Sequence, residues 1–292
     1  MELFRALAVI AEPPREEAAR VAEALGLGAL ASPEEYTETF VFQLYPYASV
    51  YLGPEGMLGG EARDRVAGFW RALELSPPAE VDHLAVMLAL YARLCELEAG
   101  AKDTRARAGW HAARKAYLWE HLLSWLPAYL SKLDETGTPF YRRWGALLSD
   151  ALAAEASAVG RQESLPLALR EAPGLSDPRA GSTEDFLRSL VAPARGGMVL
   201  VRADFSRAAR ELGAGTRLGE RRFMLQTLFE QDARATLGWL AAEAARWAGR
   251  HERGRETFGG VARAWAAKAE AAARLLHELE QTTDAKPEDA RI

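Results

Sequence analysis

Apolar positions repeat at helical spacing along most of this chain. The most apolar stretch, about residues 80–98, carries two stripes with intervals of three and four. The stripes are Val81, Leu84, Leu88, Tyr91 and Cys95, and beside them Met87, Leu90, Leu94 and Leu97. A helix that is apolar on most sides is buried. The pattern therefore predicts the central helix of a bundle here, with Asp82 on its polar face.

Further helices are predicted on both sides of this stretch. Ser32-Pro33-Glu34-Glu35 combines an N-cap serine, a proline at the first helical position and a glutamate three residues after the cap. Helical spacing continues over about residues 104–132, where Pro127 is expected to kink or divide the helix, and again over 139–157 and 183–280. The only short β-branched run is 198–201. The sequence predicts an all-α fold, a multi-helix bundle.

A change of composition divides the chain. Residues 165–182 contain Pro166, Pro173, Gly174, Pro178 and Gly181, which predicts a linker or long loop. It separates an N-terminal helical lobe, residues 1–164, from a C-terminal helical lobe, residues 183–280. The polar ending, residues 281–292, is predicted to be a disordered tail.

Composition and charge restrict the classes of function. The chain is 49% apolar and 26% charged, as in an ordinary globular protein, and its net charge of −5 argues against nucleic acid as the main partner. The single cysteine, Cys95, excludes a disulfide framework and a zinc site built on several thiolates. No stretch approaches the ~20 apolar residues that span a bilayer, and the acidic N-terminus lacks the features of a signal peptide. We expect a soluble, cytoplasmic protein without membrane insertion.

Signatures of common enzymes are missing from the sequence. It has no Gly-Lys pair for a phosphate-binding loop and no Gly-x-Ser-x-Gly elbow. Residues 26–31 fit a dinucleotide fingerprint loosely, but they follow a helical pattern where a strand is required. His251-Glu252 lacks the second histidine of a zinc protease. The sequence therefore predicts a binding protein with no catalytic residue, metal or cofactor.

Six aromatic rings gather in the segment from residue 36 to residue 51. They are Tyr36, Phe40, Phe42, Tyr45, Tyr47 and Tyr51. Core packing best explains any one of them taken alone. Six rings around the turn at Pro46 exceed what one helix face needs, so some are candidates to line a groove for an apolar peptide.

Two other pairs of residues are candidates for a role in binding. Asp82 and His83 open the central helix, where a carboxylate could meet an incoming guanidinium. Because adjacent helical residues point about 100° apart, the two side chains are not expected to face one site. His121 and Trp125 share a helix face, and a buried pair that fixes helix register explains them best.

Taken in order, these features resemble the TorD/DmsD-type chaperones, or redox enzyme maturation proteins. Pro46 to Tyr51 matches the family's Pro-x-x-Ser turn with flanking aromatics, and Asp82-His83 matches its Asp-His pair before an apolar helix. His121 to Tyr141 matches His-x-x-x-Trp-x-Pro followed by Phe-Tyr. The family usually has Glu-Pro-x-Asp-His, whereas this chain has Ala79-Glu80-Val81 before the Asp-His pair, so Glu80 is a candidate for the missing acid.

The resemblance implies an all-helical chaperone that binds the twin-arginine leader peptide, or the apo form, of a molybdopterin-containing oxidoreductase before export. It implies a monomer or a domain-swapped dimer. The predicted peptide-binding residues are Tyr45, Pro46, Tyr47, Ser49, Tyr51, Asp82 and His83. The predicted supporting residues are His121, Trp125, Pro127 and Tyr141.

Two other classes of function are alternatives. A helical regulator or adaptor would bind nucleic acid through the C-terminal lobe, where residues 202–213 resemble half of a helix-turn-helix. That hypothesis predicts a basic face formed by Arg202, Arg207, Arg210, Arg221 and Arg222. A small-molecule enzyme would use Asp82 and His83 as acid and base, and therefore requires both side chains to reach one pocket.

Overall fold

The computed structural model describes residues 2–215 and 219–283. Within these residues the regular structure is helical throughout, apart from one isolated β-bridge between Tyr47 and His83. This confirms the predicted all-α fold. The β-branched run at residues 198–201 is buried but forms no strand. No helix among the described residues has the length and apolar character needed to cross a membrane.

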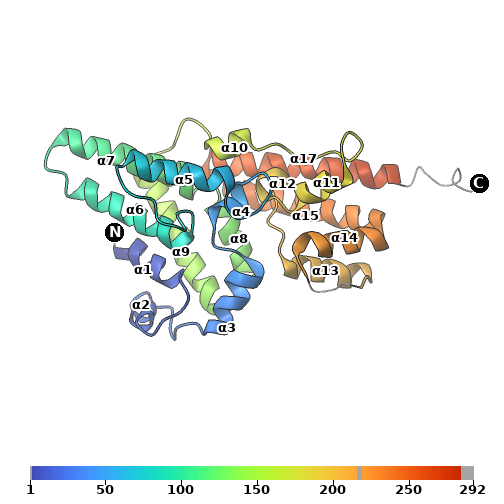
Figure 1. The fold of residues 1–292 in the computed structure, drawn as a ribbon, viewed down its shortest axis with the longest axis horizontal. Coiled ribbons are helices and arrows are strands. Elements are labelled where there is room, and N and C mark those ends of the chain that lie inside the picture. The colour runs from blue at the N-terminus through green and yellow to red at the C-terminus, as the bar shows by residue number, and fades with distance from the viewer. Residues whose placement is uncertain (1, 216–218, 284–292) are drawn as a thin grey trace, which may run out of the picture.

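The N-terminal lobe is built around the predicted central helix, α6 (Leu84–Ala99). It packs against α1 (Glu2–Ile10) and α7 (Thr104–Tyr117), and α9 (Pro139–Val159) packs on α1 (Figure 1). Leu84, Met87 and Leu88 are fully buried, as expected for a helix that is apolar on most sides. The helix begins at Leu84, later than the apolar pattern predicts.

Shorter helices complete this lobe. They are α2 (Ala18–Ala24), α3 (Pro33–Tyr36), α4 (Ala48–Leu52), α5 (Gly60–Ala72), α8 (Leu126–Thr136) and the π-helical segments η1 (Thr37–Gln43) and η2 (Leu118–Leu122). The predicted capping box opens α3, because Ser32 Oγ accepts from Glu35 N while the Glu35 carboxylate accepts from Ser32 N. Pro127 lies in the first turn of α8, so the stretch 104–132 is divided as predicted.

The C-terminal lobe is dominated by two long helices, α15 (Ala233–Arg253) and α17 (Gly260–Thr283), which lie side by side (Figure 1). Around this pair are α11 (Thr183–Leu190), α12 (Pro193–Gly196), α13 (Arg202–Leu212), α14 (Arg221–Gln231) and α16 (Arg255–Phe258). Gly213 ends α13 in the left-handed conformation, which glycine adopts without strain.

The Pro- and Gly-rich segment 165–182 follows the surface of α17. It contains the short helix α10 (Leu167–Glu171), and Lys268 Nζ of α17 donates to the carbonyl of Ala172 at 2.8 Å. At the other end of the lobe, residues 281–283 of the predicted tail belong to α17. The rest of that tail, residues 284–292, lies outside the described residues.

The two lobes share one continuous core. Trp265 Nε1 of α17 donates to the carbonyl of Ser124 at 2.9 Å, and both residues are buried. Lys132 of α8 has no exposed surface and its ammonium lies 2.9 Å from the Asp204 carboxylate of α13. These contacts fix the C-terminal helices against the segments that carry the sequence motifs.

Candidate peptide-binding site

Two motif segments that are distant in sequence are joined by backbone hydrogen bonds. Leu84 N donates to the Pro46 carbonyl at 2.8 Å, and Ala48 N donates to the Asp82 carbonyl at 3.0 Å. Ser49 N, in the first turn of α4, donates to Asp82 Oδ2 at 3.1 Å. The Pro46 turn and the Asp-His pair therefore form one structural unit in front of α6.

Asp82 is part of this unit and does not lie on the exposed face of a helix. Its exposed fraction is 2%, and its carboxylate caps the Ser49 amide. The prediction that Asp82 lies on the polar face of the central helix is therefore wrong. The pairing with residues 46–48 holds Asp82 and His83 outside the helix, which is why α6 begins at Leu84. A guanidinium could reach this carboxylate only if the turn opened.

His83 acts as the N-cap of α6. Its Nδ1 accepts from Ala85 N at 3.2 Å, and its ring lies edge-to-face with that of Tyr47 at 4.9 Å. Burial lowers the pKa of His83, although the nearby Glu80, Glu12 and Asp82 carboxylates act in the opposite direction. The imidazole and the Asp82 carboxylate are each bound to a backbone amide of their own, so this geometry does not form an acid–base pair.

Three further predicted binding residues support the turn from inside. Tyr51 is buried and donates to the Tyr45 carbonyl at 2.9 Å, and its ring stacks on Trp125 at 5.1 Å. Ser49 is fully buried, and its hydroxyl accepts from Gly59 N at 3.0 Å. Pro46 is buried as well. Among the predicted set, only Tyr45 and Tyr47 are part-exposed.

The predicted supporting residues lie behind this unit. Trp125 Nε1 donates to the His121 carbonyl at 2.9 Å, which fixes the turn that precedes Pro127. Burial, with a smaller effect of the Arg65 guanidinium, lowers the pKa of His121 to about 4. Tyr141 is buried in a cluster of rings on α9, 4.6 Å from Phe40.

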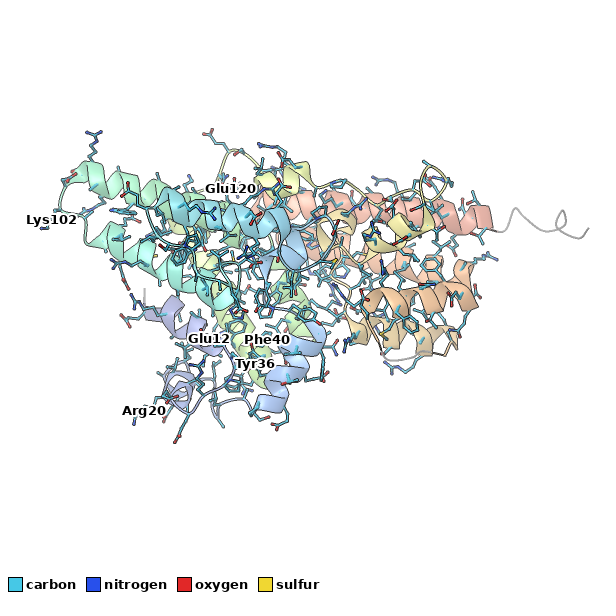
Figure 2. All side chains as sticks on the ribbon, in the orientation of Figure 1. Glu12, Arg20, Tyr36, Phe40, Lys102 and Glu120 are labelled. Carbon is cyan, nitrogen blue, oxygen red and sulfur yellow. The ribbon has the colours of Figure 1, made fainter. Side chains whose placement is uncertain are left out.

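The exposed part of the site is an acidic tyrosine cluster, formed by Glu12, Tyr36, Tyr47 and Glu80. Burial is the main cause that raises the pKa of Tyr47 to about 12, and the Glu80 carboxylate is the second. Burial, and next Glu12 and Glu80, raise the pKa of Tyr36 to about 12. Figure 2 shows Glu12 and Tyr36 near each other in the N-terminal half of the molecule. Both carboxylates are exposed, and neither has an ion-pair partner in the described part of the chain.

An apolar groove of about 470 Å³ meets this cluster at Glu12. It is lined by Ala8 and Val9 of α1, Trp70 of α5, and Ala85, Val86 and Ala89 of α6, with Glu12 and Pro78 also on its wall. Arg5, the remaining lining residue, pairs with Glu96 towards the far end of α6. The groove therefore runs along α1 and α6 from the Glu12 carboxylate at one end to Arg5 at the other, where the charge of Arg5 is neutralised by Glu96.

Trp70 gives this groove an unused hydrogen-bond donor. Its Nε1 is buried and has no hydrogen-bond partner among residues 2–215 and 219–283. A buried donor without a partner destabilises the protein by about 1–3 kcal/mol. A peptide carbonyl entering the groove would satisfy it.

Sequence reasoning identified Glu80 and the tyrosines but missed Glu12, Val9 and Trp70. Nothing in the local pattern around Glu12 distinguishes it from other surface glutamates. Its importance comes from the packing of α1 on α6, which brings it beside the Asp-His turn. For Glu80 the sequence did contain a signal, because the acid that the family usually has at position 79 is found here at position 80. No comparable signal marks Glu12, Val9 or Trp70.

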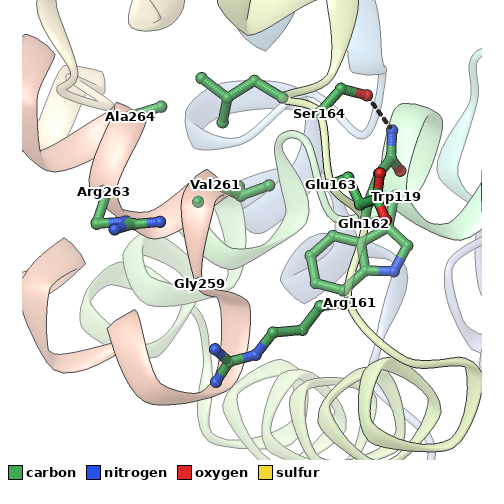
Figure 3. Close-up of a pocket in the computed structure, with 11 residues that line it drawn as sticks. Trp119, Arg161, Gln162, Glu163, Ser164, Gly259, Val261, Arg263 and Ala264 are labelled. Atoms are coloured by element: carbon green, nitrogen blue, oxygen red, sulfur yellow. Dashed lines mark hydrogen bonds between the residues drawn. The ribbon is translucent and has the colours of Figure 1, made fainter.

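A second cavity, of about 420 Å³, is lined by two arginines and one glutamate, Glu163, and therefore carries a net positive charge. It lies between the end of α9 and the start of α17, where Arg161 and Arg263 approach it beside Trp119 (Figure 3). Arg161 donates to the Glu256 carbonyl at 3.2 Å. Two guanidinium groups at one cavity would repel a ligand rich in arginine, so this cavity is not the candidate leader site.

Most of the arginines that the nucleic-acid hypothesis invokes contact other groups of the protein. Arg207 pairs with Asp204 and with the fully buried Glu243. Arg221 is directed inward and donates to the carbonyls of Leu200 and Gly56. Arg202 lies over the ring of Phe42. Arg222 lies 3.6 Å from the Glu184 carboxylate, so four of the five arginines of that hypothesis make contacts within the protein.

The structure thus combines a helical fold with an apolar groove that has the Glu12 carboxylate on its wall and Glu80 in the adjoining cluster. Residues 10–131 match the family model described as nitrate reductase delta subunit. A 96-residue stretch is 31% identical to the chaperone protein TorD of Vibrio vulnificus strain YJ016, and the same holds for the TorD chaperone of strain CMCP6. In this N-terminal part the chain is therefore similar to the TorD/NarJ-type chaperones.

The similarity is partial. The match covers 31% of this chain and 44% of each TorD chaperone, so the chain spans less than half the length of the relatives it matches. The helices that follow residue 131 lie beyond the family model. The matched part contains α6, the Pro46 turn, the Asp-His pair and the whole lining of the apolar groove except Arg5, Ala8 and Val9.

Proposed function

We propose that this protein is a cytoplasmic maturation chaperone for a molybdopterin-containing oxidoreductase. It binds the twin-arginine leader of the apoenzyme and retains the client until its cofactor is in place. The similarity of its N-terminal part to the TorD/NarJ-type chaperones supports the general role. The observation that carries the proposal is the apolar groove that begins at the acidic tyrosine cluster.

The chemistry of the cluster suits a pair of arginines. A leader of this class joins two arginines to an apolar segment, so its receptor needs carboxylates followed by an apolar surface. Glu12 and Glu80 supply the carboxylates, and guanidinium–carboxylate contacts are among the strongest hydrogen bonds in proteins. The part-exposed rings of Tyr36 and Tyr47 offer faces on which a guanidinium can stack.

The groove suits the apolar segment that follows. Its walls on α1 and α6 are alanine and valine side chains, so a bound leader would bury aliphatic surface without displacing charged groups. The Trp70 indole N–H would hold one peptide carbonyl in register. In this arrangement Asp82, Ser49, Tyr51 and His83 act indirectly, because they hold the Pro46 turn and Tyr47 in place beside Glu80.

The maturation role predicts a measurable effect on the client. An oxidoreductase encoded beside this protein is expected to contain severalfold less molybdenum when it is produced without the chaperone. The metal content of the purified client, measured by mass spectrometry with and without co-production of this chain, tests this expectation. Equal molybdenum content in both preparations would contradict the proposed role, whichever residues bind the leader.

A further inference from the structure

A pocket of about 490 Å³ lies wholly in the C-terminal lobe, beyond the part of the chain that matches the family. Helices α11, α14, α15 and α17 surround it. Its volume is within the range of ~300–1,000 Å³ typical of ligand sites. Since none of its lining residues is shared with the groove on α1 and α6, the two sites can be tested independently.

The inner surface of this pocket is apolar. Phe186, Leu187, Leu237 and Leu279 form the floor and are buried in the core. Phe229 is part-exposed and stands as a wall, edge-to-face with Phe186 at 5.9 Å. A ring that borders an open apolar pocket offers contact area at low entropic cost, as interface anchors do.

The rim of the pocket is polar and acidic. Glu230 is the only charged residue among those that line it; it is exposed, and its carboxylate accepts from Gln226 Nε2 at 2.8 Å. Two arginines near the lining residues Pro178 and Leu187 are paired with carboxylates. Arg179 pairs with Asp177 and Glu278, and Arg188 pairs with Glu184 and Asp185.

We propose that this pocket binds an apolar, helical segment of a partner polypeptide that carries a basic residue at its edge. Leucine-like side chains at one-turn spacing would fill the space over Phe186 and Leu237, while a lysine or arginine would meet Glu230. The acidic rim selects against an acidic segment and against a phosphate-bearing ligand. The C-terminal lobe thereby carries a second polypeptide site, separate from the proposed leader site.

A fluorescent peptide provides the test. The probe is a short labelled peptide of alanine and glutamine, with leucines at one-turn spacing and two lysines flanking them. The control peptide has the same composition with its leucines distributed around the helix. Fluorescence anisotropy with the full-length protein is expected to show saturable binding of the first peptide and at least about tenfold weaker binding of the second.

Variants of the protein locate that binding. Phe229→Ala and Glu230→Lys are each expected to weaken it about tenfold, whereas Phe42→Ala and Glu163→Lys, which change similar exposed residues elsewhere, leave it unchanged. Phe229→Ala is expected to leave the affinity for the leader unchanged, and Glu12→Gln is expected to leave the affinity for this peptide unchanged. The proposal for this pocket and the proposed leader site can therefore be refuted separately.

Two results would overturn the proposal. Equal affinity of Phe229→Ala, Glu230→Lys and the unaltered protein for the peptide would place the binding elsewhere. A dimer that becomes a monomer on Phe229→Ala, measured by sedimentation, would instead show that a second copy of this chain fills the pocket.

Discussion

Replacement of both Glu12 and Glu80 by glutamine is expected to weaken the binding of a twin-arginine leader by about 100-fold. Each glutamine keeps the size of the side chain and removes the charge that a guanidinium needs. A hydrogen bond to a charged group contributes about 1.5–3 kcal/mol, and about 1.4 kcal/mol corresponds to tenfold in affinity. Because both carboxylates are exposed, we take the lower end of that range for each.

The matched control is the double variant Glu163→Gln/Glu256→Gln, which removes the same two negative charges at exposed positions that do not line the groove. It is expected to bind the leader like the unaltered protein. The affinity of the unaltered protein should also fall as salt is raised, since exposed charges are screened. Equal weakening in the two double variants would show that general charge attraction, and not the acidic tyrosine cluster, draws the leader.

Asp204→Ala is expected to destabilise the protein by about 3–5 kcal/mol, because it leaves a buried lysine without its main partner. Asp204 accepts from Lys132 Nζ at 2.9 Å and from Arg207 at 3.2 Å, and it also accepts from Val201 N. Lys132 has no exposed surface and would keep the Glu135 carboxylate and the ring of Trp247 as partners. Burial raises the pKa of Glu135, but the Lys132 and Arg250 cations outweigh this effect and lower the pKa to about 2, so Glu135 is ionised at neutral pH.

Urea unfolding followed by circular dichroism measures this loss. The control is Glu252→Ala, which removes an exposed pair with Arg255 and is expected to cost about 0–1 kcal/mol. Because Lys132 belongs to α8 and Asp204 to α13, the larger loss would show that the two lobes stabilise each other. A loss for Asp204→Ala no greater than that for the control would mean that the lobes dock without this ion pair.

Much of the fold follows from local patterns. The double apolar stripe identified α6 because a helix buried on most sides has no long polar face, and Ser32 with Glu35 marked the start of α3. Pro127 divided the stretch before α8 because proline cannot donate within a helix. These signals are contained in a few neighbouring residues, so no knowledge of tertiary contacts was needed.

The candidate site was less predictable because it depends on contacts between distant segments. The backbone pairing of residues 46–48 with 82–84 buries Asp82, whereas helical periodicity assigned it to an exposed face. Glu12 joins the site through the packing of α1 on α6, which no spacing within either helix reveals. The roles of Tyr45, Tyr47 and their neighbours in binding a peptide stay predictions until a leader has been titrated.

Isothermal titration of the purified protein with a synthetic twin-arginine leader, from an oxidoreductase encoded beside it, tests the central claim most directly. The second titrant is the same leader with both arginines replaced by alanine. We predict saturable binding of the first leader and at least about 100-fold weaker binding of the second, since the carboxylates of Glu12 and Glu80 would lose both guanidinium partners. Equal affinity for the two leaders, or no binding of either, would contradict the claim that this protein recognises a twin-arginine leader.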